Sequence, residues 1–205
     1  NGVLTLDNYN LTVAAATPVE GNFSSTTHVK ADGTGQFIKT YAAGNGAFTF
    51  PIGDGTNYSP VTLEFTLNGA GNIGFRTINT VHPNNGVAPD YIERYFVSTS
   101  SVGTPYRYNL SFKYPEADVV GQESNMMIQK WNGSAWSVYN SSVEDGEAVS
   151  IQTLNNTNAP LTGTSHFTVR TAEVNYYRTV DSGLWSDVSI WEVSTDPDFS
   201  GASTP

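Results

Sequence analysis

Alternation of apolar and polar residues with a period of two dominates this chain and constrains its fold more than any other feature. In YRYNLSFKY, residues 106–114, every second side chain is aromatic or aliphatic, so all of these share one face of an extended strand. VTLEFTL (61–67) and HFTVR (166–170) follow the same pattern. Such segments predict half-buried strands that pair in antiparallel sheets.

Turn-forming dipeptides separate these strands, and no long stretch has helical periodicity. The best helical candidate, YPEADVVGQESNMM, is limited to one or two turns by Pro115 and Gly121. Short strands with closely spaced turns predict an all-β fold, an antiparallel β-sandwich of immunoglobulin-like or jelly-roll-like type over residues 30–172. The turn signals are Asp32-Gly33, Asn45-Gly46, Asp54-Gly55, Asn68-Gly69, Asn132-Gly133 and Asp145-Gly146.

The two ends differ from this central domain. Residues 1–29 are interpreted as a terminal β-rung or lead-in segment, and residues 173–205 as the start of a next module or a linker. Because short strands cannot cover their own apolar side chains, we expect these ends to contact neighbouring modules or other copies of the chain, or to dock on the sandwich. The contact residues expected are Leu4, Leu6, Leu11, Val13, Trp185, Ile190 and Trp191.

Composition excludes several classes of function. The formal net charge is −10, from 9 basic and 19 acidic residues, and no Lys/Arg cluster offers a footprint for nucleic acid. The chain has no cysteine, which excludes disulfides and Cys-ligated zinc. No apolar run reaches the roughly 20 residues of a membrane span, so no membrane insertion is expected. The chain begins at Asn1 and is interpreted as a fragment or mature piece of a longer protein.

A family resemblance rests on several short motifs along nearly the whole chain: NGVLTLDNYNLTV, FTFPIGDGTNYSPVTLEF, IERYFVSTSS, QKWNGSAWSVYN and GTSHFTVRT. Together they resemble an adhesin-like repeat module of large Bacteroidetes surface proteins that are secreted by the type IX system. YRTVDSGLWSDVSIWE is similar to the start of a following repeat region, often a parallel β-helix, and GVLTLDNYNLTV to the last rung of a preceding one. The resemblance implies an extracellular, cell-surface protein without established catalytic residues.

Two glycine-rich motifs are better explained as turns than as ligand sites. GAGNIG (69–74) matches a dinucleotide-binding fingerprint, but the β-rich FRTINTVHPNNG follows it where a helix is required, so a hairpin is expected. In GDGTNYSP (53–60), Gly53 and Gly55 can supply positive φ, and Asp54 and Asn57 can bond back to the backbone. A calcium site at Asp54 and Asn57 is the alternative.

The segment DPDFSG (196–201) fits the opening D-x-D-x-S-G of a calcium loop. Asp196, Asp198 and Ser200 are the candidate ligands for Ca²⁺. A solvated linker is the competing interpretation, and otherwise no cofactor is expected.

No catalytic residues are proposed, and the chain is not expected to be an enzyme. His28, His82 and His166 are far apart in sequence and form no recognisable motif. Ser165 and His166 cannot act as a dyad, because adjacent residues of a strand point to opposite faces. The acidic residues show no spacing that selects a glycosidase pair.

The aromatic hairpin KWNGSAWSVY (130–139) is the strongest candidate binding site. Trp131, Trp136 and Tyr139 are candidates for a flat platform under a sugar ring, with burial in the core as the alternative. We expect Trp131 to be largely buried and Trp136 to be the more exposed, and the two need not share a face.

The sequence therefore favours a non-enzymatic structural or adhesive module of a large secreted surface protein, which spaces or displays binding surfaces and stacks into a stalk or filament. Its partners would be neighbouring modules and extracellular glycan. The alternative is a carbohydrate-binding module attached to a secreted polysaccharide-degrading enzyme.

Overall fold

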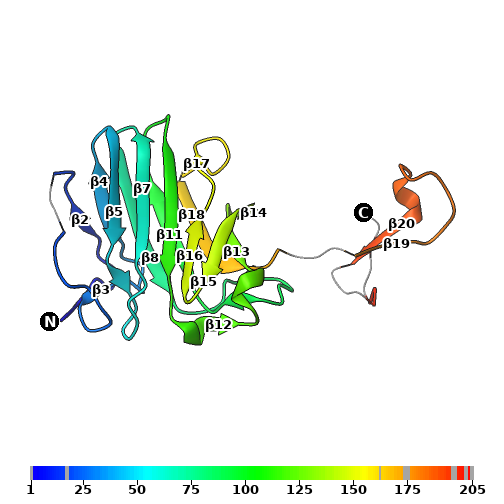
Figure 1. Ribbon diagram of the computed structural model, residues 1–205, viewed down its shortest axis with the longest axis horizontal. Coiled ribbons are helices and arrows are strands. Elements are labelled where there is room, and N and C mark those ends of the chain that lie inside the picture. The colour runs from blue at the N-terminus through cyan, green and yellow to red at the C-terminus, as the bar shows by residue number, and fades with distance from the viewer. Residues whose placement is uncertain are drawn as a thin grey trace.

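The computed structural model describes residues 2–16, 19–161, 163–172, 176–194, 198–200 and 203. Within these ranges the chain is all-β, which confirms the predicted fold class (Figure 1). The only helical elements there are three short 3₁₀ turns: η1 (Glu116–Asp118), η2 (Glu123–Asn125) and η3 (Val188–Ile190).

Two large sheets pack face to face. The first runs in the order β12 (Val119–Val120), β9 (Tyr91–Ile92), β18 (Gly163–Arg170), β10 (Tyr95–Ser100), β8 (Gly71–Ile78), β4 (Phe37–Tyr41) and β2 (Leu11–Val13), with β13 (Met127–Trp131) and β14 (Trp136–Tyr139) extending from β18. The second runs in the order β15 (Ser141–Glu144), β16 (Glu147–Ser150), β11 (Arg107–Lys113), β7 (Val61–Asn68) and β5 (Gly44–Phe50), with β17 (Leu154–Asn155) on β11.

The core between these sheets follows the alternation seen in the sequence. In β11, Tyr108, Leu110 and Phe112 are buried while Arg107 and Lys113 are exposed. Aromatic rings join the two layers: the ring of Phe112 lies 4.7 Å from that of Phe96 and 5.7 Å from that of Phe167, centroid to centroid. The apolar face of each strand therefore closes on its counterpart in the other sheet, as period-two patterning requires.

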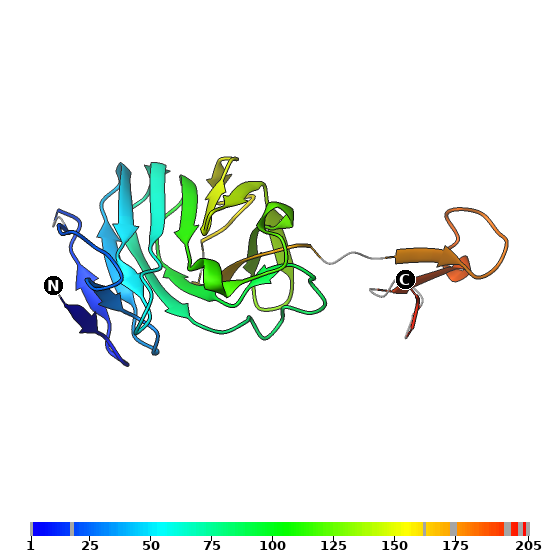
Figure 2. The same ribbon diagram turned by 60° about the horizontal axis from the view of Figure 1, so that its bottom comes forward.

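The N-terminal segment pairs in parallel with strands of the central domain. β1 (Val3–Thr5), β3 (His28–Lys30) and β6 (Ile52–Gly53) form a separate three-stranded parallel sheet, and β2 pairs in parallel with β4. Figures 1 and 2 show these strands at one end of the sandwich, with β13 and β14 at the other. The C-terminal β19 (Tyr176–Thr179) and β20 (Trp191–Ser194) pair with each other in a two-stranded sheet.

Some of the turn predictions are confirmed and two are wrong. Asp145-Gly146 connects β15 to β16, both residues having positive φ, as a two-residue hairpin requires. GAGNIG does not make the expected hairpin: it connects β7 of the second sheet to β8 of the first, and it continues as a strand where a nucleotide site requires a helix. Asn45-Gly46 is not a turn: it lies inside β5, where the register shifts in a bulge.

GDGTNYSP forms a tight turn built around the carboxylate of Asp54. Its Oδ1 accepts the backbone N–H groups of Thr56 (2.6 Å) and Asn57 (2.7 Å), and its Oδ2 accepts from Arg94 (2.8 Å). The carboxylate is therefore committed to the turn and to Arg94, which argues against the calcium alternative at Asp54 and Asn57.

The glycine of this turn is required for space and not, as expected, for positive φ. Neither Gly53 nor Gly55 has positive φ. A Cβ on Gly53 would lie 2.1 Å from the carbonyl oxygen of Asn57 and 2.9 Å from the ring of His28, whereas one on Gly55 would meet nothing closer than 3.6 Å.

We expect Gly53→Ala to lower the free energy of unfolding by about 1–3 kcal/mol, because the added methyl group overlaps a backbone oxygen that cannot move freely. Gly55→Ala, in the same turn, is the matched control and should change it little. Urea unfolding followed by tryptophan fluorescence measures both. Equal effects of the two substitutions would contradict the steric role of Gly53.

Arg94 is the most completely enclosed charge of the fold. It is 0% exposed and donates to Asp54, to Asp118 (2.6 Å) and to the hydroxyl of Thr77 (3.2 Å). The pKa of Asp118 is raised above its ordinary value, with burial as the largest cause, although Arg94 acts to lower it. Burial also acts to raise the pKa of Asp54, but the hydrogen bonds from Asn57, Thr56 and Arg94 bring it below its ordinary value.

We expect Arg94→Ala to cost about 3–5 kcal/mol of unfolding free energy, because it leaves buried carboxylates without their cation. Lys113→Ala removes the exposed ion pair with Glu147 and should cost no more than about 1 kcal/mol. Denaturant unfolding at neutral pH compares the two. A small effect of Arg94→Ala would show that the buried network does not hold the sandwich together.

Candidate binding groove

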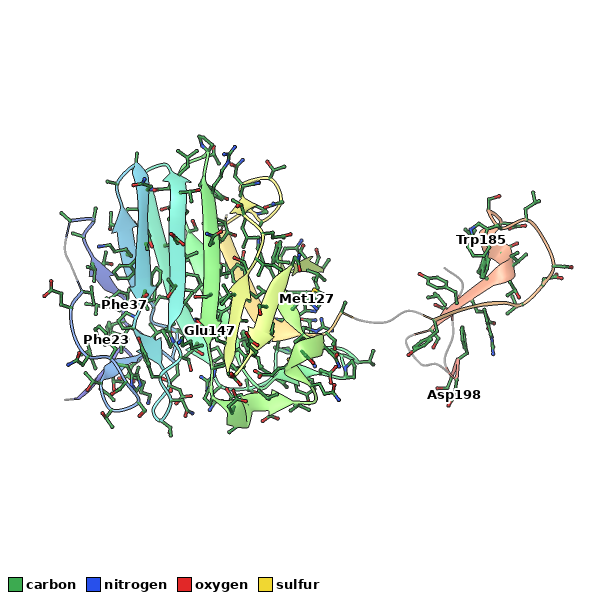
Figure 3. The ribbon with its side chains drawn as sticks, viewed as in Figure 1. Phe23, Phe37, Met127, Glu147, Trp185 and Asp198 are labelled. Atoms are coloured by element: carbon green, nitrogen blue, oxygen red, sulfur yellow. The ribbon has the colours of Figure 1, made fainter. Side chains whose placement is uncertain are left out.

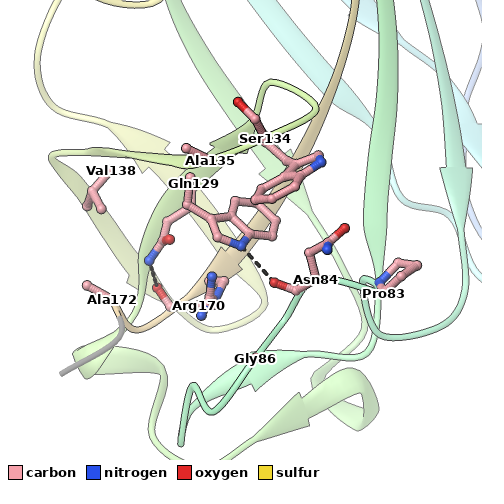
Figure 4. A pocket seen from close by; sticks show the side chains of 11 residues that line it. Pro83, Asn84, Gly86, Gln129, Ser134, Ala135, Val138, Arg170 and Ala172 are labelled. Atoms are coloured by element: carbon pink, nitrogen blue, oxygen red, sulfur yellow. Dashed lines mark hydrogen bonds between the residues drawn. The ribbon is translucent and has the colours of Figure 1, made fainter. Parts of the chain in front are cut away.

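A groove of about 650 Å³ opens on the outer face of the first sheet, where β13, β14 and β18 meet the loop of residues 79–90 (Figure 4). Outward residues of the three strands form its floor, and the loop forms one wall. Its lining residues are Pro83, Asn84, Gly86, Gln129, Trp131, Ser134, Ala135, Trp136, Val138, Arg170 and Ala172.

Strand register explains why these side chains converge. Trp131 lies opposite Trp136 in β14 and opposite His166 in β18, and residues that oppose each other across a ladder share a face. Other outward positions are an even number of residues away from these: Gln129 is two positions from Trp131 in β13, and Arg170 is four from His166 in β18. The inward positions of the same strands, such as Phe167, belong to the core.

The two tryptophans share a face and form one cluster, a point that their spacing in the sequence left open. Their rings are 5.3 Å apart and tilted by 56°. Trp136 also lies 4.8 Å from the ring of His82, and its Nε1 donates to the carbonyl oxygen of Asn84 at 2.8 Å. Both tryptophans are of intermediate exposure, so most of the Trp131 side chain is covered but part of it reaches the surface.

Tyr139 does not belong to the platform, which corrects the sequence prediction. It is only 3% exposed and lies in the hydrophobic core. Three positions separate it from Trp136, and an odd separation along a strand places two side chains on opposite faces. Val138, two positions from Trp136, takes the place in the groove that was assigned to Tyr139.

Arg170 supports the cluster from beneath. It is 1% exposed, its guanidinium carbon lies 4.9 Å from the ring centre of Trp136, and its Nη2 donates to the carbonyl oxygen of Asn85 at 2.7 Å. Gln129, also 1% exposed, donates from Nε2 to the carbonyl oxygen of Arg170 at 3.0 Å. The floor is thus fixed by bonds to backbone carbonyls of two different segments.

A histidine pair behind the tryptophans was missed by sequence reasoning, which found only isolated histidines. Nε2 of His82 lies 2.9 Å from Nδ1 of His166. The backbone N–H of Asn84 donates to Nδ1 of His82 at 3.0 Å, so that nitrogen is an acceptor. Neutral His82 therefore carries its proton on Nε2 and donates it to His166, whose own proton is on its Nε2.

The surroundings of this pair keep it uncharged. Burial lowers the pKa of His82 to about 4, and the charges of His166 and Arg170 act in the same direction. Burial is also the main cause that lowers the pKa of His166, with Arg76 contributing. A proton added to His82 would also displace the Asn84 N–H from its acceptor.

The predicted calcium site at residues 196–201 is only partly covered by the described residues. Asp196 lies outside the described residues, so a calcium site with Asp198 and Ser200 stays a prediction. In the part of the chain that the structure describes, no three His, Asp or Glu side chains gather as a metal site. No helix among those residues is long and apolar enough to cross a membrane.

The predicted module contacts separate into two groups. Leu6 and Ile190 are each 7% exposed and therefore already covered, and Leu11 and Val13 pack against the core. Leu4 is 54% exposed and Trp185 83%, and both remain available for contact (Figure 3 labels Trp185). Trp191 lies 4.7 Å from Trp185, ring to ring, beside an apolar cleft of about 330 Å³ that Tyr177 and Val188 complete.

Comparisons with protein-family models, curated proteins and solved structures found no match to this chain. The resemblance to secreted adhesin-like modules therefore stays a prediction, and the groove is interpreted from its own geometry.

We expect the stability of the protein to fall as the pH is lowered from 6.5 to 4. Between these values an unfolded His82 binds a proton that the folded one does not, so acid favours unfolding, by at most about 3 kcal/mol. Urea unfolding at a series of pH values measures this. His82→Gln should reduce the slope, and an unchanged slope in that variant would contradict the assignment.

Proposed function

We propose that this chain is a non-enzymatic structural and adhesive module of a large secreted cell-surface protein, joined to its neighbours by stacking of parallel strands. The observation that carries this proposal is the parallel addition of β1 and β2 to the sandwich. In single-domain antiparallel sandwiches the strands are normally joined by hairpins and Greek-key connections. Parallel stacking of consecutive coils is instead the architecture of solenoids.

The stacked positions of the two strand pairs lie a similar number of residues apart. Val3 pairs with His28, a separation of 25 positions, and Leu11 pairs with Phe37, a separation of 26. The corner between the two strands is also stacked, since the backbone N–H of Gly35 donates to the carbonyl oxygen of Asp7 at 2.9 Å. Residues 3–13 therefore form a coil that repeats the path of residues 28–39.

Glycines and amide side chains adapt the corner to this stacking. A Cβ on Gly33 would lie 2.2 Å from the Asp7 carbonyl oxygen, and one on Gly35 would lie 2.3 Å from the Tyr9 carbonyl oxygen. Asn10 accepts the backbone N–H of Gln36 at 2.9 Å. Residues 28–39, the second coil, thus allow the backbone of the first coil, residues 3–13, to approach closely.

The outer side of the first coil, residues 3–13, carries two unpaired sheet edges, one on β1 and one on β2. β1 ends the three-stranded sheet and β2 ends the long path of the first sheet. Leu11 donates its N–H to Gln36, so the N–H of Thr12, next along a parallel strand, points to the open side. An open edge with Val3 and Leu4 exposed is suited to pairing with another coil.

The second candidate function is a carbohydrate-binding module attached to a secreted polysaccharide-degrading enzyme. The partly exposed tryptophans of the groove favour it. The two candidates differ in what the whole protein contains: tandem modules in the first case and a catalytic domain in the second.

Small-angle scattering on proteins that carry one, two and three tandem copies of this chain tests the structural role. We expect the maximum dimension to grow in proportion to copy number, because stacked edges fix each module on the next. Thr12→Pro removes an outward N–H without touching the β4 ladder, and should convert the rod into a flexible string. Compact particles of unchanging aspect ratio, or no effect of Thr12→Pro, would contradict the proposal.

A further inference from the structure

We propose that the groove over β13, β14 and β18 binds a hexopyranose ring of a neutral polysaccharide, with Trp136 as the stacking surface. This site lies at the opposite end of the sandwich from the open edge of β1 and β2 (Figures 1 and 2). The inference goes beyond the structural role and does not depend on it.

The chemistry of the lining selects a neutral, hydroxyl-rich ligand. Although the chain has a net charge of −10, none of the described residues that line the groove is acidic. Its one cation, Arg170, is buried against the ring of Trp136 and engaged with a backbone carbonyl, so it offers no contact for a phosphate or carboxylate. What remains at the surface is indole, amide, hydroxyl and methyl groups.

A pyranose ring matches this combination. One of its faces presents C–H groups that pack against an electron-rich aromatic ring, while its hydroxyls extend sideways to hydrogen-bonding groups. In the groove the tryptophans supply the aromatic surface, and Asn84 and Ser134 supply amide and hydroxyl groups along the lining. The volume of about 650 Å³ is within the roughly 300–1,000 Å³ typical of small-molecule sites.

Trp136 is held in place before any ligand arrives. Its Nε1–H donates to the Asn84 carbonyl oxygen, and Arg170 packs on its ring. The ring of His82 lies 4.8 Å from the Trp136 ring, and that of Trp131 lies 5.3 Å from it. Binding therefore requires little loss of side-chain freedom, which favours affinity. The contacts also leave the indole no free polar atom, so its open surface is apolar.

The neutral histidine pair contributes to this arrangement. His82 packs edge-on against Trp136 and donates to His166, which keeps the loop of residues 79–90 closed on the sheet. Because Asn84 lies two residues from His82, the same contacts place the carbonyl that holds the indole.

Affinity electrophoresis of the 205-residue chain in gels containing a β-glucan, an α-glucan or a galactomannan tests the proposal, with polygalacturonate as the acidic comparison. We expect retardation by at least one neutral polysaccharide and none by polygalacturonate. Trp136→Ala should weaken the interaction at least about tenfold, and Trp136→Phe less, since it keeps an aromatic face.

Two further variants separate loss of the site from loss of the fold. Val138 is 45% exposed and lines the groove, so Val138→Glu should abolish binding by adding bulk and charge while the fold is kept. Trp185→Ala is the matched control: it removes the most exposed tryptophan, on the C-terminal hairpin, and should bind as the unaltered chain does.

The proposal is wrong if no neutral polysaccharide retards the chain, if polygalacturonate is preferred, or if Val138→Glu and Trp136→Ala bind normally. It is also wrong if Trp185→Ala abolishes binding, which would place the ligand on the hairpin. Because scattering on tandem copies reports only on the open edge, either proposal can fail while the other stands.

Discussion

The guanidinium of Arg94 joins parts of the molecule that are far apart in sequence. It lies between β9 and β10 and donates to the turn that follows β6, to η1 and to β8. The same turn receives His28, whose Nε2 lies 2.7 Å from the carbonyl oxygen of Asp54. The N-terminal parallel stack is thereby connected to the sandwich through one buried charge cluster, in which two carboxylates share a single cation.

The groove depends on this framework indirectly. The loop that closes over the outer face leaves the first sheet at the end of β8 and returns at β9, just before Arg94. That loop brings His82 and Asn84 to the tryptophans. As a result β18 is buried on both faces, by the core on one side and by the loop and β13–β14 hairpin on the other, although its sequence suggested a half-buried strand.

The fold thus combines two construction principles. Its centre is an antiparallel sandwich closed by aromatic packing. Its N-terminal end is a coil that adds strands in parallel and finishes on open backbone groups. A unit of this kind has a stable core and an extendable edge, which is the combination that we propose for a spacer and display module.

The sequence by itself determined the all-β class, the strands with strict alternation, and several turns, because side-chain periodicity and turn chemistry are local properties. It also indicated the aromatic hairpin. Register between strands decided the rest. Sequence could not show that Trp131 opposes both Trp136 and His166, that Tyr139 points inward, or that His82 reaches His166 across 84 positions. Beyond the aromatic hairpin, the polar outward positions His166 and Arg170 in HFTVR were a further local signal of the groove. Such contacts depend on which strands become neighbours, and only the tertiary structure fixes that choice.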